Sequence, residues 1–109
     1  MNAIPWPCIH EFLAVVTNQR AFTRPTPASA AIEQIESLLR SPYVVCIGEG
    51  DGYFGVLADL VRSSGVMGGA IHDARIAAIC LRNGVSELLT ADRDFSRFPG
   101  LKTRNPLVS

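Results

Sequence analysis

The segment from Gly69 to Phe95 constrains the fold more strongly than any other part of the chain. It predicts an apolar helix from about Ile71 to Asn83, followed by a short apolar strand from Glu87 to Ala91. Gly84, between the two, is the residue type that most readily ends a helix. A helix that leads directly into a near-continuous apolar strand is typical of an α/β fold with a parallel sheet.

The rest of the chain continues this alternation of helices and short strands. Thr26 is expected to cap a helix whose first residue is Pro27, because both residue types favour those positions. We expect one domain over residues 1–109, since the chain is no longer than a typical single domain. In order, the predicted elements before Gly69 are a helix over Pro7–Asn18, the helix that Pro42 ends, a buried parallel strand over Tyr43–Ile47, a glycine-rich loop over Gly48–Gly52 and a helix over Tyr53–Ser64 closed by Gly65; a short edge strand is expected after Pro99.

Charge and composition exclude several classes of protein. Ten basic and ten acidic residues give no net charge, so no bulk field draws the whole chain to nucleic acid. No apolar run approaches the ~20 residues that a membrane span needs, so we expect no membrane partner. Three cysteines without metal-binding spacing fit reduced side chains, which indicates a cytoplasmic location.

Four acids stand at positions where carboxylates can hold a divalent metal: Glu11, Asp73, Asp92 and Asp94. Asp73 is near the start of an apolar helix, and Asp92 follows the carboxyl end of a strand, which is where open parallel sheets bind ligands. Carboxylate oxygens suit Mg²⁺ and Mn²⁺. Two such ions about 4 Å apart can activate a water and stabilise the leaving oxygen in phosphodiester hydrolysis.

Each of these acids also has a plainer interpretation. Asp73 can be a capping or dipole-stabilising acid, and Glu11 an ordinary acid in the first turn of a helix. Asp92 and Asp94 can belong to a solvated turn around Arg93. They can also be the acid pair of a sugar-nucleotide transferase, although the chain is short for a nucleotide domain of that kind.

Three groups of motifs occur in order along nearly the whole chain. They are Ile4-Pro5-Trp6 leading into Glu11-Phe12-Leu13 and Val15-Val16-Thr17-Asn18; His72-Asp73-Ala74 with Ile76-Ala77-Ala78; and Leu89-Thr90 with Asp92-Arg93-Asp94-Phe95, followed by Phe98-Pro99-Gly100-Leu101 and Asn105-Pro106-Leu107. Together they resemble the PIN-domain ribonucleases, and most closely the VapC-type toxins of bacterial toxin–antitoxin pairs. No single motif is decisive, but the ordered set at these spacings is fairly specific.

The resemblance implies a fold, an activity and partners. The fold would be a PIN-like three-layer α/β fold with a short parallel sheet. The activity would be that of an endoribonuclease toxin that depends on Mg²⁺ or Mn²⁺, cuts RNA, is inhibited by a small antitoxin protein and commonly forms a homodimer. Glu11, Asp73 and Asp92 would be catalytic metal ligands, and Asp94 a further metal ligand.

The chain departs from the family pattern at its N-terminus. Family members begin with a short apolar strand that ends in the first conserved acid, whereas this chain starts at Met1-Asn2-Ala3-Ile4, past that strand. We therefore expect an N-terminally truncated PIN domain, whose exposed strand edges favour association. The alternative is a non-catalytic PIN remnant that only binds a partner protein. Reading the DNA upstream of Met1 in frame distinguishes a mis-assigned start from a true loss.

Overall fold

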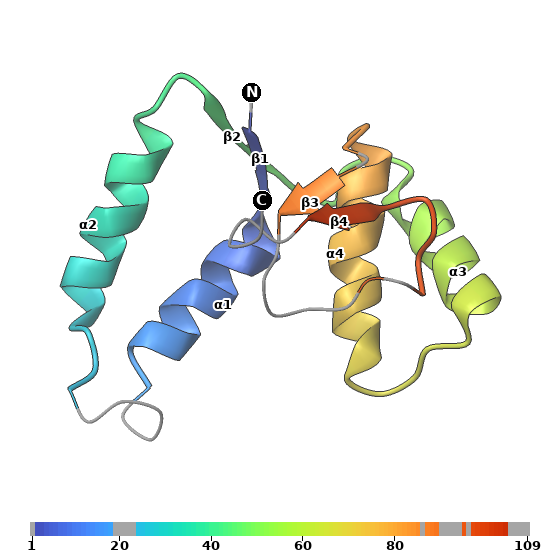
Figure 1. Ribbon diagram of the computed structural model, residues 1–109, viewed down its shortest axis with the longest axis horizontal. Helices are drawn as coiled ribbons and strands as arrows, with labels where there is room; N and C mark the ends of the chain where they lie inside the picture. The colour runs from blue at the N-terminus through green and yellow to red at the C-terminus, as the bar shows by residue number, and fades with distance from the viewer. Residues whose placement is uncertain (1, 19–23, 86, 90–94, 96, 105–109) are drawn as a thin grey trace. The chain divides into compact units, whose positions relative to one another are not determined.

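The computed structural model describes residues 2–18, 24–85, 87–89, 95 and 97–104 (Figure 1). The chain divides into two compact units, Met1–Ile47 and Gly48–Ser109. Helices and parallel strand pairs occur in both units, so the predicted α/β class is confirmed. The prediction of one domain stays a prediction. The elements are β1 (Asn2–Pro5), α1 (Trp6–Val16), α2 (Ala28–Leu39), β2 (Val44–Ile47), α3 (Tyr53–Ser64), α4 (Ala70–Arg82), β3 (Glu87–Leu89) and β4 (Lys102–Arg104).

The first unit is built on a parallel pair of strands, β1 and β2. The register runs from Asn2 opposite Val44 to Pro5 opposite Ile47, and the amide of Asn2 donates to the Tyr43 carbonyl at 2.6 Å. The predicted parallel strand at Tyr43–Ile47 is confirmed as Val44–Ile47, but the prediction that it is buried is wrong, because its residues are half-buried and Val45 is 41% exposed. The sequence gives no sign of β1, because four residues before a helix are too few to show a strand period.

Helices α1 and α2 pack against each other beside this strand pair. Ile9 is the buried residue of α1 and Ala31 that of α2. The expected cap at Thr26 is wrong by one residue: Pro27 occupies the N-cap position of α2, and it has no side-chain oxygen to donate or accept. The Thr26 amide instead donates to the Val16 carbonyl at 2.9 Å, which ties the connection to the end of α1.

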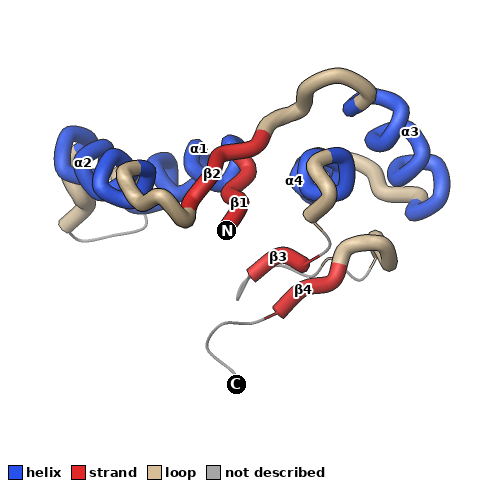
Figure 2. Tube along the Cα trace, turned by 90° about the horizontal axis from the view of Figure 1, so that it is seen from above, coloured by secondary structure: helices blue, strands red, loops and turns tan. Residues whose placement is uncertain are grey.

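The second unit is organised around α4. Within this unit α4 lies between α3 and the β3–β4 pair (Figure 2). Its small side chains allow close packing, and Ala74, Ala77 and Ala78 are fully buried. The larger members of the same core are Ile76, Ile79 and Cys80 on α4 with Phe95, Phe98 and Leu101 near the C-terminus.

The ends of the helices and the positions of the strands in this unit agree with the predictions from the sequence. Gly65 ends α3 in the left-handed conformation, at φ +70°, and its amide donates to the Val61 carbonyl at 3.0 Å. The predicted strand after α4 is confirmed at Glu87–Leu89, and residues 90–91 lie outside the described residues. The expected edge strand is Lys102–Arg104, parallel to β3. In the described part of the chain, every helix is too short or too polar to cross a membrane.

Candidate functional site

Asp73 lies in the first turn of α4 and is half-buried. The helix begins after a tight turn in which the amides of Ala70 and Ile71 donate to the carbonyls of Met67 and Gly68, at 3.2 and 3.1 Å. Gly69 is the N-cap residue, so Asp73 is not the capping residue. Its position does allow interaction with the positive end of the helix dipole. A carboxylate here is therefore placed where negative charge is favoured.

Glu11 lies in the middle of α1 and is exposed. The helix begins at Trp6 and has no acid in its first turn, so the interpretation of Glu11 as a first-turn acid is wrong. Glu11 belongs to the first unit and Asp73 to the second, and each is placed only within its own unit.

The other two predicted ligands, Asp92 and Asp94, lie outside the described residues. Among residues 2–18, 24–85, 87–89, 95 and 97–104, no three His, Cys, Asp or Glu side chains are grouped closely enough to hold a metal ion. The predicted four-carboxylate site thus stays a prediction, with two of its members placed on helices.

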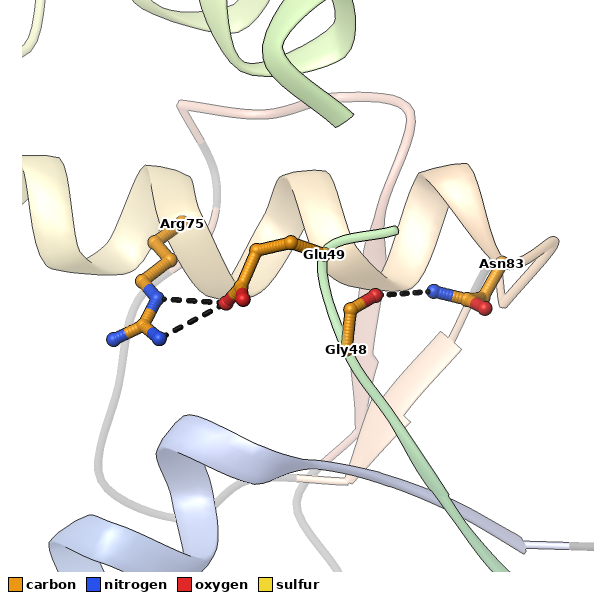
Figure 3. A network of polar contacts seen from close by, with 4 residues as sticks. All are labelled: Gly48, Glu49, Arg75 and Asn83. Atoms are coloured by element: carbon orange, nitrogen blue, oxygen red, sulfur yellow. Dashed lines mark hydrogen bonds and ion pairs between the residues drawn. The ribbon is translucent and has the colours of Figure 1, made fainter. Parts of the chain in front are cut away.

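A polar network that the sequence does not predict joins the glycine-rich loop to α4 (Figure 3). Both Nε and Nη2 of Arg75 donate to the same oxygen of Glu49, at 3.1 and 2.9 Å. Nδ2 of Asn83 donates to the Gly48 carbonyl at 3.1 Å and to the Ile79 carbonyl at 2.8 Å. We call these contacts, with those of Arg82 described next, the loop network.

Arg82 extends the loop network at the C-terminal end of α4. Its Nε donates to the Asp51 carbonyl at 2.7 Å, and its Nη1 donates to Oδ1 of Asn83 at 3.2 Å. The guanidinium covers Gly50, which adopts φ +64°. One sequence signal could have drawn attention to this loop, namely its position directly after an apolar strand, since that is where α/β folds place their ligand-binding loops.

Among the residues that the structure describes, Tyr53 and Cys46 have perturbed pKa values. Burial raises the pKa of the Tyr53 hydroxyl, the negative charge of Glu49 raises it further, and the positive charge of Arg75 opposes both. Tyr53 is the first residue of α3, so it lies at the end of the same glycine-rich loop. In the first unit, burial raises the pKa of the Cys46 thiol on β2.

An apolar hollow of about 400 Å³ opens between β1, α1 and α2. Aliphatic and aromatic side chains form most of its wall, with one amide. They are Ile4, Cys8, Ile9, Phe12, Gln34, Ile35 and Leu38. The hollow lies entirely within the first unit, and its chemistry suits apolar side chains of another molecule.

Comparison with curated proteins decides the family. Ribonuclease VapC48 of Mycobacterium tuberculosis is 30% identical to this chain over 101 residues, which are 93% of this chain and 70% of the relative. The chain belongs to the VapC ribonuclease family. Ribonuclease VapC43 of the same species is 36% identical over 96 residues, 88% of this chain and 65% of its own length. No family model matches the chain.

A third VapC relative agrees with the first two. Ribonuclease VapC37 of M. tuberculosis is 29% identical over 101 residues, 93% of this chain and 69% of its own length. The chain thus spans about two thirds of the relatives it matches. The resemblance to VapC-type proteins that the motifs indicate is confirmed, and helices α1–α4 with the short parallel strand pairs of the described residues are consistent with a PIN-like fold.

Proposed function

We propose that this VapC-family chain is a metal-dependent endoribonuclease toxin of a toxin–antitoxin system. The observation that carries the proposal is its similarity, over about nine tenths of its length, to several proteins named as VapC ribonucleases. The position of Asp73 supports it, because a half-buried carboxylate at the start of a tightly packed helix is held in a defined place.

The proposed ligands are Glu11, Asp73 and Asp92, with Asp94 as a fourth. All of them carry carboxylate oxygens, which are the donors that Mg²⁺ and Mn²⁺ prefer, so the donor set fits a hard divalent cation. When bound, such an ion lowers the pKa of a water and stabilises charge on the phosphodiester. We propose no role in metal binding for the cysteines, whose sulfur suits softer metals.

The described residues would contribute to the reaction through position and charge. Asp73 lies in the first turn of α4, at the positive end of the helix dipole, where a negative charge is favoured. The packed small side chains of Ala74, Ala77 and Ala78 fix the helix that carries it. Asp73 would therefore hold its charge in place before RNA arrives, which reduces the reorganisation that the reaction requires.

The direct test is RNA cleavage by the purified protein, measured with a set of fluorescent RNA oligonucleotides, with Mg²⁺ and with excess EDTA. We expect cleavage only with the metal, and a loss of at least about 100-fold on Asp73→Asn if this carboxylate is a ligand. The matched control is Asp59→Asn, which changes a highly exposed acid on α3. Equal cleavage by Asp73→Asn and the parent would contradict the assignment of Asp73. No metal-dependent cleavage, with retained partner binding, would favour the non-catalytic remnant.

For the antitoxin we propose the apolar hollow as the contact site, because apolar side chains line most of it. The test is co-purification with the product of the adjoining gene. Leu38→Asp places a charge in the hollow and is expected to abolish co-purification. Leu39→Asp is the control, since Leu39 is similarly exposed on the same helix but does not line the hollow. Equal effects of both substitutions would refute this site.

A further inference from the structure

The Glu49–Arg75 ion pair joins the glycine-rich loop to α4, so its geometry restrains these two segments as well as the two side chains. The pair joins residues 26 positions apart, and two donors of one guanidinium meet one carboxylate oxygen. Each side chain is 41% exposed. By contrast, the Arg62–Asp59 pair on α3 spans 3.7 Å between side chains that are 79% and 82% exposed. Partial burial and the double contact favour a persistent pair at Glu49–Arg75.

The position of Arg75 on α4 relates this pair to Asp73. Two residues along an α-helix correspond to a rotation of roughly 200°, so Asp73 in the first turn and Arg75 in the second project from different sides of the helix. Arg75, Ile79 and Arg82 are spaced so that they share one face, and Arg75 and Arg82 both contact the glycine-rich loop. The loop network therefore holds the side of α4 that carries Arg75 and Arg82, which differs from the side that carries Asp73.

The loop network has two anchors on α4. At the C-terminal end, Asn83 and Arg82 bind the carbonyls of Gly48 and Asp51. At the other end, the side chain of Glu49 reaches Arg75, in the second turn of the helix. Because the first anchor fixes the backbone of the loop, Glu49 is held in place as a partner for Arg75.

From these contacts we infer that Glu49 and Arg75 are positioning residues. Their ion pair sets the place of the first turns of α4 and, through it, the place of the Asp73 carboxylate. The link to catalysis rests on the proposed function, whereas the restraint on the helix does not. The ion pair requires opposite charges at the two positions, so exchanging the charges is expected to preserve the restraint on α4.

The restraint is tested by hydrogen exchange of the full chain, followed in the peptide that covers the start of α4. We expect Glu49→Gln and Arg75→Gln each to speed exchange there by at least about fivefold, because local opening becomes easier when the contact is lost. The double variant E49R/R75E is expected to restore slow exchange. The control D59R/R62D reverses the exposed pair on α3 and is expected to change nothing.

Several results would overturn the restraint. They are unchanged exchange in both single variants, exchange that the double variant fails to restore, and equally faster exchange in α3, which would indicate general destabilisation. Each of these can be read whether or not the protein cleaves RNA. Thermal unfolding of every variant shows whether it is folded, and the double variant keeps the comparison informative if one single variant unfolds.

The catalytic consequence is tested on the same variants by Mg²⁺-dependent RNA cleavage. We expect each single variant to lower kcat about tenfold with KM unchanged, because a small displacement of a reacting group is costly, and the double variant to recover most of the loss. A raised KM without recovery in E49R/R75E would instead assign Arg75 to RNA binding and overturn the positioning role. If the parent itself does not cleave, the proposed function fails, and hydrogen exchange alone decides the restraint on α4.

Discussion

Gly50→Ala tests two physical reasons for a glycine in the loop network, which are the left-handed backbone and the lack of space for a Cβ beside Arg82. Gly50 adopts φ +64°, and a Cβ added to it would lie 2.7 Å from Cζ of Arg82. A left-handed conformation costs an L-residue about 1–2 kcal/mol, and Gly→Ala returns about 0.4–1 kcal/mol through the unfolded state. Moving Arg82 also weakens its 2.7 Å bond to the Asp51 carbonyl. That exposed hydrogen bond is worth about 0.5–1 kcal/mol. The net destabilisation is therefore about 0.5–2.6 kcal/mol.

Two other glycines provide matched controls for this substitution. Gly65 has φ +70° with open space around its Cβ position, so Gly65→Ala carries the conformational strain without displacing a side chain. Gly55 lies inside α3, has no positive φ and also has open space. Gly55→Ala is expected to stabilise the protein by about 0.5–1 kcal/mol, because alanine favours the helix.

The assay is urea-induced unfolding followed by circular dichroism, with Gly50→Ala measured in the parent and in an Arg82→Ala background. The double-mutant cycle isolates the part of the cost that depends on Arg82, which we expect to be about 0.5–1 kcal/mol. An equal cost of Gly50→Ala in both backgrounds would refute the contact with the guanidinium. A stabilising Gly50→Ala would refute the argument from the left-handed backbone as well.

Two further predictions concern the same unit. Ile79 is fully buried on α4, so Ile79→Ala is expected to cost about 2–5 kcal/mol in urea unfolding, more than Ile32→Ala at a position that is 44% exposed; equal costs would contradict the assigned core. Burial and the charge of Glu49 raise the pKa of Tyr53 above its ordinary value of 10.0. The contribution of Tyr53 to the free energy of unfolding is therefore complete below pH 10, and it is lost as the pH rises through the higher pKa of the folded state. Tyr53→Phe removes the ionisable group and should flatten the alkaline fall in thermal stability, and an unchanged profile would exclude Tyr53 as its source.

The candidate site was predictable in part. Sequence alone places Asp73 near the start of one helix and Glu11 within another, and the structure agrees. The assignment of Glu11 to a first turn is wrong, because α1 begins at Trp6, one residue before the predicted start, and Glu11 lies in the middle of the helix. Asp92 and Asp94 stay predictions, since both lie outside the described residues.

Sequence by itself determined the order of helices, the α/β class and the family, because apolar periodicity, glycines such as Gly65 and ordered motifs are local properties of the chain. Only the tertiary structure decided that Asn2–Pro5 is a strand, since a segment so short becomes one by pairing with β2. It also decided that Glu49 meets Arg75. A contact between residues 26 apart depends on the path of the loop and the packing of α4, which no local pattern records.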